Sequence, residues 1–275
     1  MAAGAVSRVA IITGAGTGIG RALALRLAAD GVHILAVGRR ETPLTELQRD
    51  AGGAEHVTPV VADVASADGR AAIVSAAKGH GPIDFLVQNA GTIAPIAALA
   101  DIKPSEWEQA FAVNVHGPLF LLQALNERLR RPGARVLHIG SGAASKAVGG
   151  WTAYCATKAA FLSVYRSMAA ELRPEGVLVG SVRPGIVNTP MQVAIRDADE
   201  AAMPDVSFFK GLHAAMEPGA AAPGSAPPSG SLDTPENVAA FLSFLLTRSG
   251  DDEFGAEEWD IRDASHHHRW TTRKA

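Results

Sequence analysis

The sequence predicts a single-domain, doubly wound α/β fold over residues 1–275, with about seven parallel strands and helices on both faces of the sheet. Short runs rich in branched apolar residues alternate with longer stretches that have helical spacing of apolar positions. Several short runs are apolar throughout, as expected for strands that helices bury on both sides. The predicted strands are residues 8–13, 32–37, 57–62, 83–88, 135–140, 177–183 and 257–261, and the predicted helices are 19–29, 67–78, 106–129, 151–172 and 235–247.

The composition favours a globular protein that acts on a small molecule. Of its 275 residues, 47% are hydrophobic and 19% charged, which is enough for a substantial core and excludes wholesale disorder. The formal net charge of −3 gives no basic excess, so we expect no nucleic-acid binding. The apolar runs are shorter than the ~20 residues of a membrane span, and no signal-peptide pattern is visible. The single cysteine, Cys155, allows no intramolecular disulfide and indicates a reducing, cytoplasmic environment.

The regular alternation stops after residue 183, where prolines become frequent. We interpret residues 190–233 as a substrate lid, in which 191–212 covers an apolar pocket and orders on binding. Residues 217–231 are almost entirely Gly, Ala, Pro and Ser, so we expect them to stay loose. Residues 264–275 are predicted to form a frayed tail, and we interpret His266 to His268 as part of it, with no metal site.

A glycine-rich segment, residues 13–20, reads Thr-Gly-Ala-Gly-Thr-Gly-Ile-Gly between the first predicted strand and helix. A tight strand-to-helix turn needs residues without a Cβ, and their backbone can approach a pyrophosphate closely. The following helix N-terminus offers free N–H groups to the anion. The alternative is a turn that simply needs glycines, but its place at the first strand–helix junction favours nucleotide binding.

Tyr154 and Lys158 lie one helical turn apart, on one face of a predicted helix. A lysine cation beside a phenol favours the phenolate and lowers the pKa of the tyrosine, which suits proton transfer to a developing alkoxide. Ser141 follows the fifth predicted strand, where a doubly wound sheet forms its ligand crevice, and can hydrogen-bond a substrate carbonyl. The structural alternative is a buried tyrosine with a satisfied hydroxyl and a solvated lysine.

These motifs together resemble the short-chain dehydrogenase/reductase family over roughly residues 8–190 plus the last helix and strand. Segment 13–20 is similar to its T-G-x-x-x-G-x-G motif, residues 89–91 to its N-A-G and residues 183–189 to its P-G-x-V-x-T segment. The resemblance implies a Rossmann-type fold in which Tyr154 transfers the proton and Lys158 lowers its pKa while binding the nicotinamide ribose. It also implies that Ser141 orients the carbonyl and that Asn114 holds a water in a proton relay.

The same resemblance implies a set of cofactor-binding residues. They are Gly14, Thr17, Gly18, Ile19, Gly20, Arg39, Arg40, Asp63, Val64, Asn89, Ala90, Gly91, Tyr154, Lys158, Pro184, Gly185, Val187 and Thr189. Within the family, residues 141–155 and 188–196 resemble the sepiapterin reductase and benzil reductase branch, which reduces pterin side-chain ketones or α-dicarbonyls with NADPH. Asp260 matches the acid that anchors the pterin in that branch, although Pro190 stands where it commonly has an acid.

Three further residues are candidates for the substrate pocket. Trp151 precedes Tyr154 by one helical turn, and its alternative role is packing against the sheet edge. Met191 and Phe208 belong to the apolar set of the predicted lid.

The end of the second predicted strand indicates which dinucleotide is used. An acid at this point selects NAD through the adenosine ribose, but here Gly38 occupies the position, and Arg39 and Arg40 follow. A guanidinium binds a ribose 2′-phosphate by charge-assisted hydrogen bonds, so we expect a preference for NADP(H). The alternative is a solvated arginine pair that leads into the next helix and is partly neutralised by Glu41.

The sequence therefore predicts an NADP(H)-dependent oxidoreductase that reduces a ketone or α-dicarbonyl, with Tyr154 as proton donor. A dinucleotide-binding sensor with little turnover is one alternative, and an interaction scaffold is another. Sedimentation should detect a homodimer or homotetramer, because the resemblance implies pairing through helices 106–129 and 151–172, which carry more apolar positions than one sheet-facing stripe needs.

Overall fold

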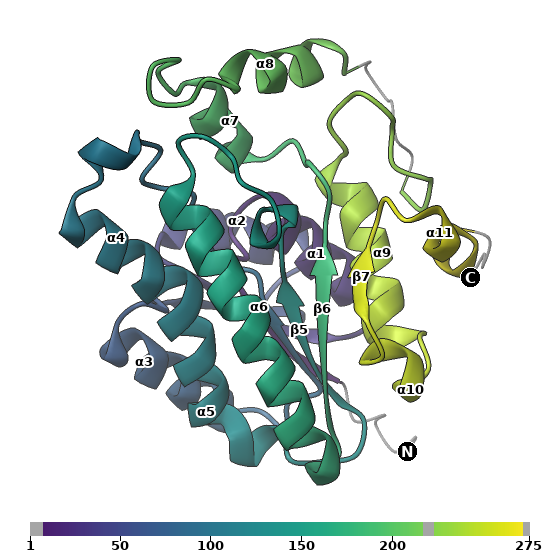
Figure 1. Cartoon of the computed structure of the whole chain (residues 1–275). Helices are drawn as coiled ribbons and strands as arrows, with labels where there is room; N and C mark the ends of the chain where they lie inside the picture. Colours follow the sequence, from purple (N-terminus) through teal and green to yellow (C-terminus); the bar gives the residue numbers. More distant parts are fainter. Residues whose placement is uncertain (1–7, 217–222, 272–275) are drawn as a thin grey trace, which may run out of the picture.

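The computed structural model describes residues 8–216 and 223–271 and contains one parallel sheet with the strand order β3-β2-β1-β4-β5-β6-β7 (Figure 1). The predicted doubly wound fold is confirmed. The strands are β1 (Val9–Thr13), β2 (His33–Gly38), β3 (Val57–Val61), β4 (Phe85–Gln88), β5 (Ala134–Ile139), β6 (Val177–Arg183) and β7 (Glu258–Asp260). The chain order reverses direction between β1 and β4, so a ligand crevice is expected at the carboxyl ends of these strands.

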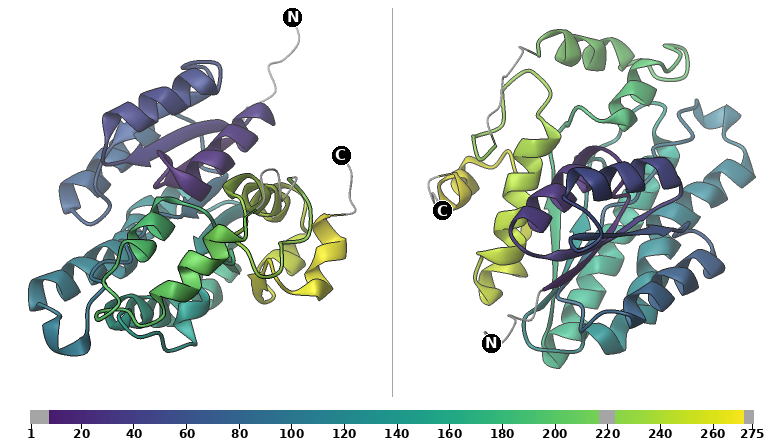
Figure 2. Two further views of the ribbon diagram at one scale, coloured as in Figure 1. Left: turned by 90° about the horizontal axis from the view of Figure 1, so that it is seen from above. Right: turned by 180° about the vertical axis from the view of Figure 1, so that it is seen from behind.

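Helices cover both faces of the sheet. On one face lie α1 (Gly18–Ala29), α2 (Glu41–Asp50) and α9 (Pro235–Thr247), whose buried residues share a core with β1, β2 and β7 (Figure 2, right). The other face carries α3 (Ala67–Lys78), α5 (Gly117–Leu129) and α6 (Thr152–Leu172). Every residue of β1 is buried, which explains why this strand is an apolar run with little alternation. Every residue of β5 is buried as well, including Arg135 and His138.

The predicted helix 106–129 is interrupted in the structure. It consists of α4 (Pro104–Phe111), a π-helical turn (Ala112–His116) and α5. Pro118 has no N–H to donate to the carbonyl of Asn114, so regular α-helical bonding cannot continue through this point. The widened turn keeps Asn114 buried, with an exposure of 3%. Such turns frequently mark functional sites.

The expectation of a frayed tail over residues 264–275 is wrong for its described part. Ala264–Trp270 forms α11, which begins where Asp263 accepts a hydrogen bond from the Ser265 N–H at 2.9 Å. Trp270 is buried against Phe241 of α9, with ring centroids 5.1 Å apart. This apolar anchor holds the helix beside α9 and β7 (Figure 1). Residues 272–275 lie outside the described residues.

His266 has a structural role within this helix. Its Nε2 lies 3.2 Å from Glu257, its Nδ1 lies 3.3 Å from the Asp260 carbonyl, and its ring packs on Trp259. Within the described ranges, no group of three potential metal ligands occurs.

The proline- and glycine-rich segment is only partly as expected. Residues 217–222 lie outside the described residues, but the segment that follows is anchored. The backbone N–H groups of Gly224 and Ser225 donate to Oδ1 of the fully buried Asn237 at 3.0 and 3.1 Å. Ser231 is also buried. A single buried amide thus replaces the apolar contacts that this sequence lacks, and the expectation that all of 217–231 stays loose is wrong for these residues.

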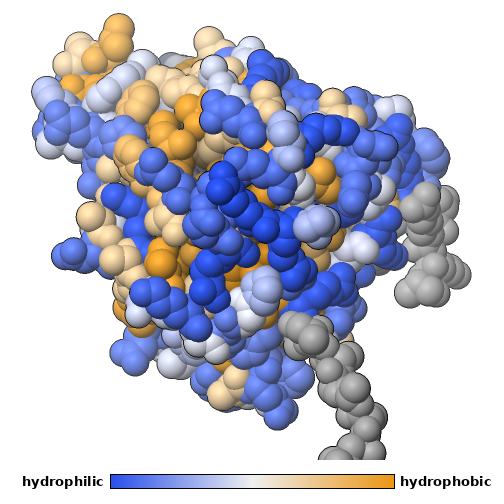
Figure 3. Space-filling model, turned by 90° about the horizontal axis from the view of Figure 1, so that it is seen from below, coloured by the Kyte–Doolittle hydropathy of each residue, from blue (hydrophilic) through white to orange (hydrophobic). Residues whose placement is uncertain are grey.

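Two short helices, α7 (Pro190–Arg196) and α8 (Val206–Ala214), lie above the carboxyl ends of the strands, while α10 (Asp251–Phe254) lies near the opposite end (Figure 1). The face below the sheet, where the strands begin, carries hydrophilic residues over much of its surface (Figure 3). No helix in the described ranges is long and apolar enough to cross a membrane.

Candidate active site

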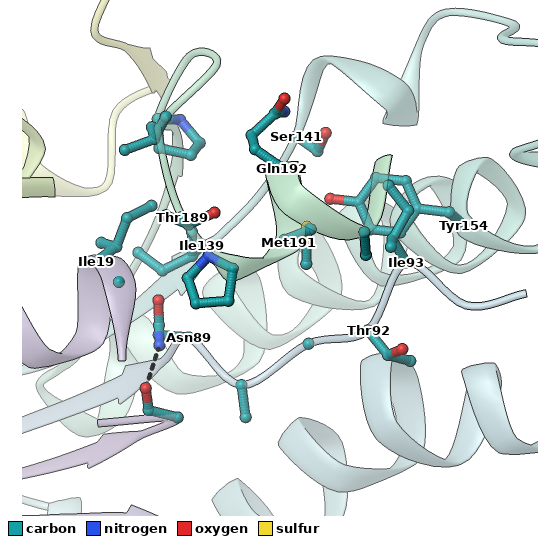
Figure 4. Close-up of a pocket in the computed structure, with 18 of the residues that line it drawn as sticks. Ile19, Asn89, Thr92, Ile93, Ile139, Ser141, Tyr154, Thr189, Met191 and Gln192 are labelled. Carbon is teal, nitrogen blue, oxygen red and sulfur yellow. Dashed lines mark hydrogen bonds between the residues drawn. The ribbon is translucent and has the colours of Figure 1, made fainter. Parts of the chain in front are cut away.

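A cavity of about 810 Å³ opens at the carboxyl ends of the strands. The loop after β1 and the end of β2 form one part of its wall, and the segment from β6 into α7 forms another. Ser141 from the loop after β5 and Tyr154 from α6 line the same space (Figure 4). Phe208 and Phe209 from α8 also line it, so a single cavity extends from the glycine-rich loop to α7 and α8.

The glycine-rich loop has the backbone shape that a phosphate site needs. Gly14 and Gly18 have φ angles of 68° and 55°, and a Cβ on Gly18 would lie 3.0 Å from the side chain of Thr189. Asn89 after β4 fixes the loop, because its Nδ2 donates to the carbonyl of Thr13 at 2.8 Å and to that of Gly14 at 3.3 Å. The bond to Gly14 is drawn in Figure 4. No side chain caps α1 at Thr17, so its first N–H groups can bind an anion.

The far end of the cavity carries two positive charges. Arg39 and Arg40 lie beyond the carboxyl end of β2, and both line the cavity together with Asp63 and Val64. Asp63 is oriented by a hydrogen bond from the Ala65 N–H to its Oδ1 at 2.9 Å. This end of the cavity therefore carries two guanidinium groups and one fixed carboxylate.

Ser141, Tyr154 and Lys158 line the cavity nearer the lid. Ser141 caps a short 3₁₀ turn after β5, where its Oγ accepts a hydrogen bond from Ala143 N–H at 3.1 Å. Tyr154 and Lys158 lie on α6, and both are buried. The Lys158 ammonium donates to the carbonyl of Ile139 at 2.8 Å and lies 5.7 Å from the Tyr154 ring centroid. The tertiary structure thus brings the three side chains to one wall.

Burial has opposite effects on the pKa values of these two α6 side chains. It raises the pKa of the Tyr154 phenol above its usual value, and the nearby Ser141 hydroxyl only partly offsets this. Burial therefore opposes the expected lowering of the Tyr154 pKa by Lys158. Burial also lowers the pKa of Lys158 to about 8, because the ammonium has left water. The phenol remains protonated at neutral pH and is available as a proton donor.

Asn114 lies just behind this wall. Its Oδ1 accepts a hydrogen bond from Thr92 N–H at 2.8 Å, and its Nδ2 donates to the Thr92 carbonyl at 2.8 Å and to Thr157 Oγ1 at 3.0 Å. Asn114 thereby ties the loop after β4 to α6, although its own side chain does not line the cavity. The sequence places it on a helix but does not reveal this connection.

The nicotinamide side of the predicted site is formed by the segment after β6. Pro184, Gly185, Val187 and Thr189 all line the cavity. The segment is held in place by a short parallel bridge between Val187 and Asp233.

The four predicted substrate-pocket residues also line the cavity: Trp151, Met191, Phe208 and Asp260. Trp151 packs edge-on against Tyr154 with ring centroids 5.7 Å apart. Asp260 lies 3.4 Å from Nε of Arg183, which compensates its charge. Phe209 of α8 is buried against Trp151 at this end of the cavity.

One predicted cofactor residue does not line the cavity. A Cβ at Gly20 would lie 2.5 Å from Asn89 Nδ2, so this glycine permits packing behind the loop. Several other lining residues were not singled out as site residues from the sequence; they include Pro43, Thr92, Ile93, Lys146, Gln192 and Arg262. Gln192 lines the cavity together with its neighbour Met191, but nothing in the local sequence indicates that this polar side chain lies there.

The fold and the site define a dinucleotide-binding oxidoreductase, and comparison with known proteins gives its family. The model of the short chain dehydrogenase family matches residues 8–200, and the chain belongs to this family of NAD(P)-dependent enzymes. An uncharacterised oxidoreductase of Schizosaccharomyces pombe is 34% identical over 86% of this chain and 90% of its own length. L-xylulose reductase of Bos taurus is 32% identical over 70% and 78% of the two chains.

Structural similarity extends over nearly the whole chain. The crystal structure of L-sorbose reductase from Gluconobacter frateurii, complexed with NADPH and L-sorbose, has a TM-score of 0.75 and 26% identity. The match covers 94% of this chain and 95% of that one. The predicted family and the assignment as an oxidoreductase are therefore confirmed.

Proposed function

We propose that the protein uses NADP(H) to reduce a ketone or α-dicarbonyl to the alcohol, with Tyr154 as the proton donor. The observation that carries this proposal is the placement of Ser141, Tyr154 and Lys158 in one cavity that continues to the glycine-rich loop. The names of two relatives, L-xylulose reductase and an L-sorbose reductase complexed with NADPH, support the reductive direction.

The side chains divide the chemistry among them. When bound, the nicotinamide ring supplies the hydride. Ser141 donates a hydrogen bond to the carbonyl oxygen and orients it, while Tyr154 gives its phenolic proton to the oxygen as negative charge develops there. Lys158 binds the nicotinamide ribose and stabilises the phenolate that remains. Asn114 keeps the loop after β4 against α6 and so maintains the spacing of this wall, in addition to the water-holding role that the family resemblance implies.

A panel assay that follows NADPH absorbance with simple ketones, ketoses and α-dicarbonyls tests this proposal. Turnover of at least one carbonyl class is expected. Tight NADPH binding without turnover across the panel would instead favour a dinucleotide sensor. A pterin ketone belongs in the panel, because Asp260, which resembles the pterin-anchoring acid of the sepiapterin reductase branch, lines the cavity.

Arg39→Ala should remove most of the preference for NADP(H). Each charge-assisted hydrogen bond to a 2′-phosphate contributes about 1.5–3 kcal/mol, so we expect kcat/KM with NADPH to fall about 10- to 100-fold. The value with NADH should change little, because NADH has no phosphate at this position. Steady-state kinetics with both cofactors measures the effect.

Gly38→Asp combined with Arg39→Ala serves as the complementary variant. A Cβ at Gly38 would contact only Leu44, at 3.4 Å or more, so the position accepts a side chain. The new carboxylate should accept hydrogen bonds from the ribose hydroxyls and shift the preference toward NADH. Equal kcat/KM values for the two cofactors in the wild-type protein would contradict the assignment of Arg39.

We further propose that α7 and α8 form the lid of the substrate pocket. Ile195, Met203, Phe209 and Leu212 are buried in one apolar cluster with Trp151. The proposed lid thus packs on the substrate end of the cavity and can exclude water during the reaction.

The oligomeric state is a separate proposal. Phe120 on α5 is 42% exposed, which favours an isologous contact through α5 and α6 of two subunits. We expect a dimer or tetramer in sedimentation velocity at micromolar concentration. Phe120→Glu should shift the distribution toward monomer, and a monomeric wild-type protein would contradict the proposal.

A further inference from the structure

Gln192, on α7, has a buried side chain whose amide oxygen has no partner. The residue is only 7% exposed, and its Oε1 accepts no hydrogen bond in the described part of the chain. It lines the cavity that also contains Ser141 and Tyr154, and Figure 4 shows its amide end on the side of the pocket where Ser141 lies. A buried amide without a partner is unfavourable, so a group that enters the pocket is expected to satisfy it.

Few other polar atoms in the cavity share this property. Among residues 8–216 and 223–271, only three cavity-lining residues have a buried side-chain atom without a hydrogen bond: Trp151, Arg183 and Gln192. The Arg183 Nε lies 3.4 Å from the carboxylates of Glu258 and Asp260, so its charge is compensated. Trp151 offers only an N–H donor. Gln192 therefore provides the one unsatisfied acceptor within this set.

A backbone hydrogen bond fixes Gln192 next to residues 184–189, the segment predicted to bind the nicotinamide. Thr189 is the N-cap of α7, and its carbonyl accepts a hydrogen bond from the Gln192 N–H at 2.9 Å. Because this turn is anchored, the element that carries Thr189 also holds Gln192 on the wall of the cavity. Across the pocket, Trp151 packs edge-on against the Tyr154 ring.

We propose that Gln192 binds a second oxygen of the substrate, next to the reacting carbonyl, which makes the enzyme selective for α-oxygenated ketones. This inference rests on the proposed carbonyl reduction. The hydroxyl of an α-hydroxyketone donates to Oε1, whereas the second carbonyl of an α-dicarbonyl accepts from Nε2 of the same amide. Ser141 and Tyr154 bind the reacting oxygen, and Gln192 fixes which of the neighbouring carbons faces the hydride.

Gln192→Met tests this inference, because methionine keeps the length of the side chain but removes both hydrogen-bonding groups. The substrates are butanone, acetoin and diacetyl, which share a four-carbon chain and differ in the second oxygen. We expect kcat/KM for acetoin and diacetyl to fall about three- to tenfold, the loss of one hydrogen bond, while the value for butanone stays within about twofold. Each variant is compared with wild type on the same substrate, so the different intrinsic reactivities cancel.

Gln109→Met is the matched control, because it makes the same replacement at an exposed residue of α4 that does not line the cavity. It should leave all three kcat/KM values unchanged. NADPH affinity and thermal unfolding are measured for both variants. An equal loss on all three substrates, or a loss of NADPH affinity with unchanged substrate preference, would overturn the role of Gln192. Absence of turnover by the wild-type protein on the whole ketone panel would instead overturn the proposed function, and with it this inference.

Discussion

Tyr154→Phe is expected to lower kcat by about 10²- to 10⁴-fold, the usual contribution of a general acid. The variant removes one oxygen from a side chain that is 7% exposed and packed against Trp151, so the ring can keep its position. Because burial holds the pKa of the phenol above its usual value, the group is protonated at neutral pH. No other phenol in the described residues lines the cavity, since Tyr165 points into the core below.

For Tyr154→Phe, titration with NADPH measures cofactor binding, and rapid kinetics measures the rate of the chemical step, so the two effects can be separated. The dissociation constant for NADPH should change by less than about threefold, because the Tyr154 hydroxyl adds at most one neutral hydrogen bond to the cofactor. Ser141→Ala is the companion variant and should lower kcat in the same direction. A Tyr154→Phe protein with near-normal turnover would show that another group supplies the proton.

Lys158→Met is expected to have the second large effect. It should raise the stability of the ligand-free protein and weaken its binding of NADPH. Burial lowers the pKa of Lys158 from 10.5 to about 8. Between about pH 8 and pH 10.5 the unfolded chain therefore binds more protons than the folded protein. Stability of the ligand-free wild-type protein should therefore rise with pH across this window, by about 3 kcal/mol in total. Below about pH 8, the pKa of Lys158 in the folded protein, the ammonium is charged and its burial lowers the free energy of unfolding by this full amount.

Replacing this lysine by methionine removes that cost. At about pH 7 the variant should be more stable than wild type by roughly 2 kcal/mol, since the carbonyl of Ile139 loses a hydrogen bond worth about 1 kcal/mol. The measurement is urea unfolding of both ligand-free proteins from about pH 6.5 to pH 9.5, below the range in which Tyr154 ionises. The difference between the two proteins should shrink as the pH rises. A constant difference would contradict the lowered pKa.

The same variant should bind NADPH much more weakly. The ammonium is the group proposed to hold the nicotinamide ribose, and a thioether cannot replace its donors. Lys158→Met would then be a protein that is more stable without ligand and nearly inactive. A variant that gained stability and kept cofactor affinity would assign Lys158 a structural role only.

The sequence alone was sufficient for the fold and for the residues with local signatures. Parallel strands buried on both faces tend to be continuous apolar runs, so β1 was recognisable without any partner. Positive φ angles at Gly14 and Gly18 require glycine, and Tyr154 and Lys158 share a helix face because they are one turn apart. Such features depend only on residues that are close together along the chain, so the sequence is enough to predict them.

Other features depend on residues that are distant in sequence, and only the tertiary structure decided them. The docking of α11 rests on Trp270 meeting Phe241, and no local pattern reports that contact. The place of the Asn114 side chain depends on its bonds to Thr92 and Thr157. Burial raises the pKa of Tyr154, and the residues that bury it come from distant segments of the chain. What the sequence determined was the identity and order of the groups, whereas their burial, partners and protonation came from the packing of distant segments around one cavity.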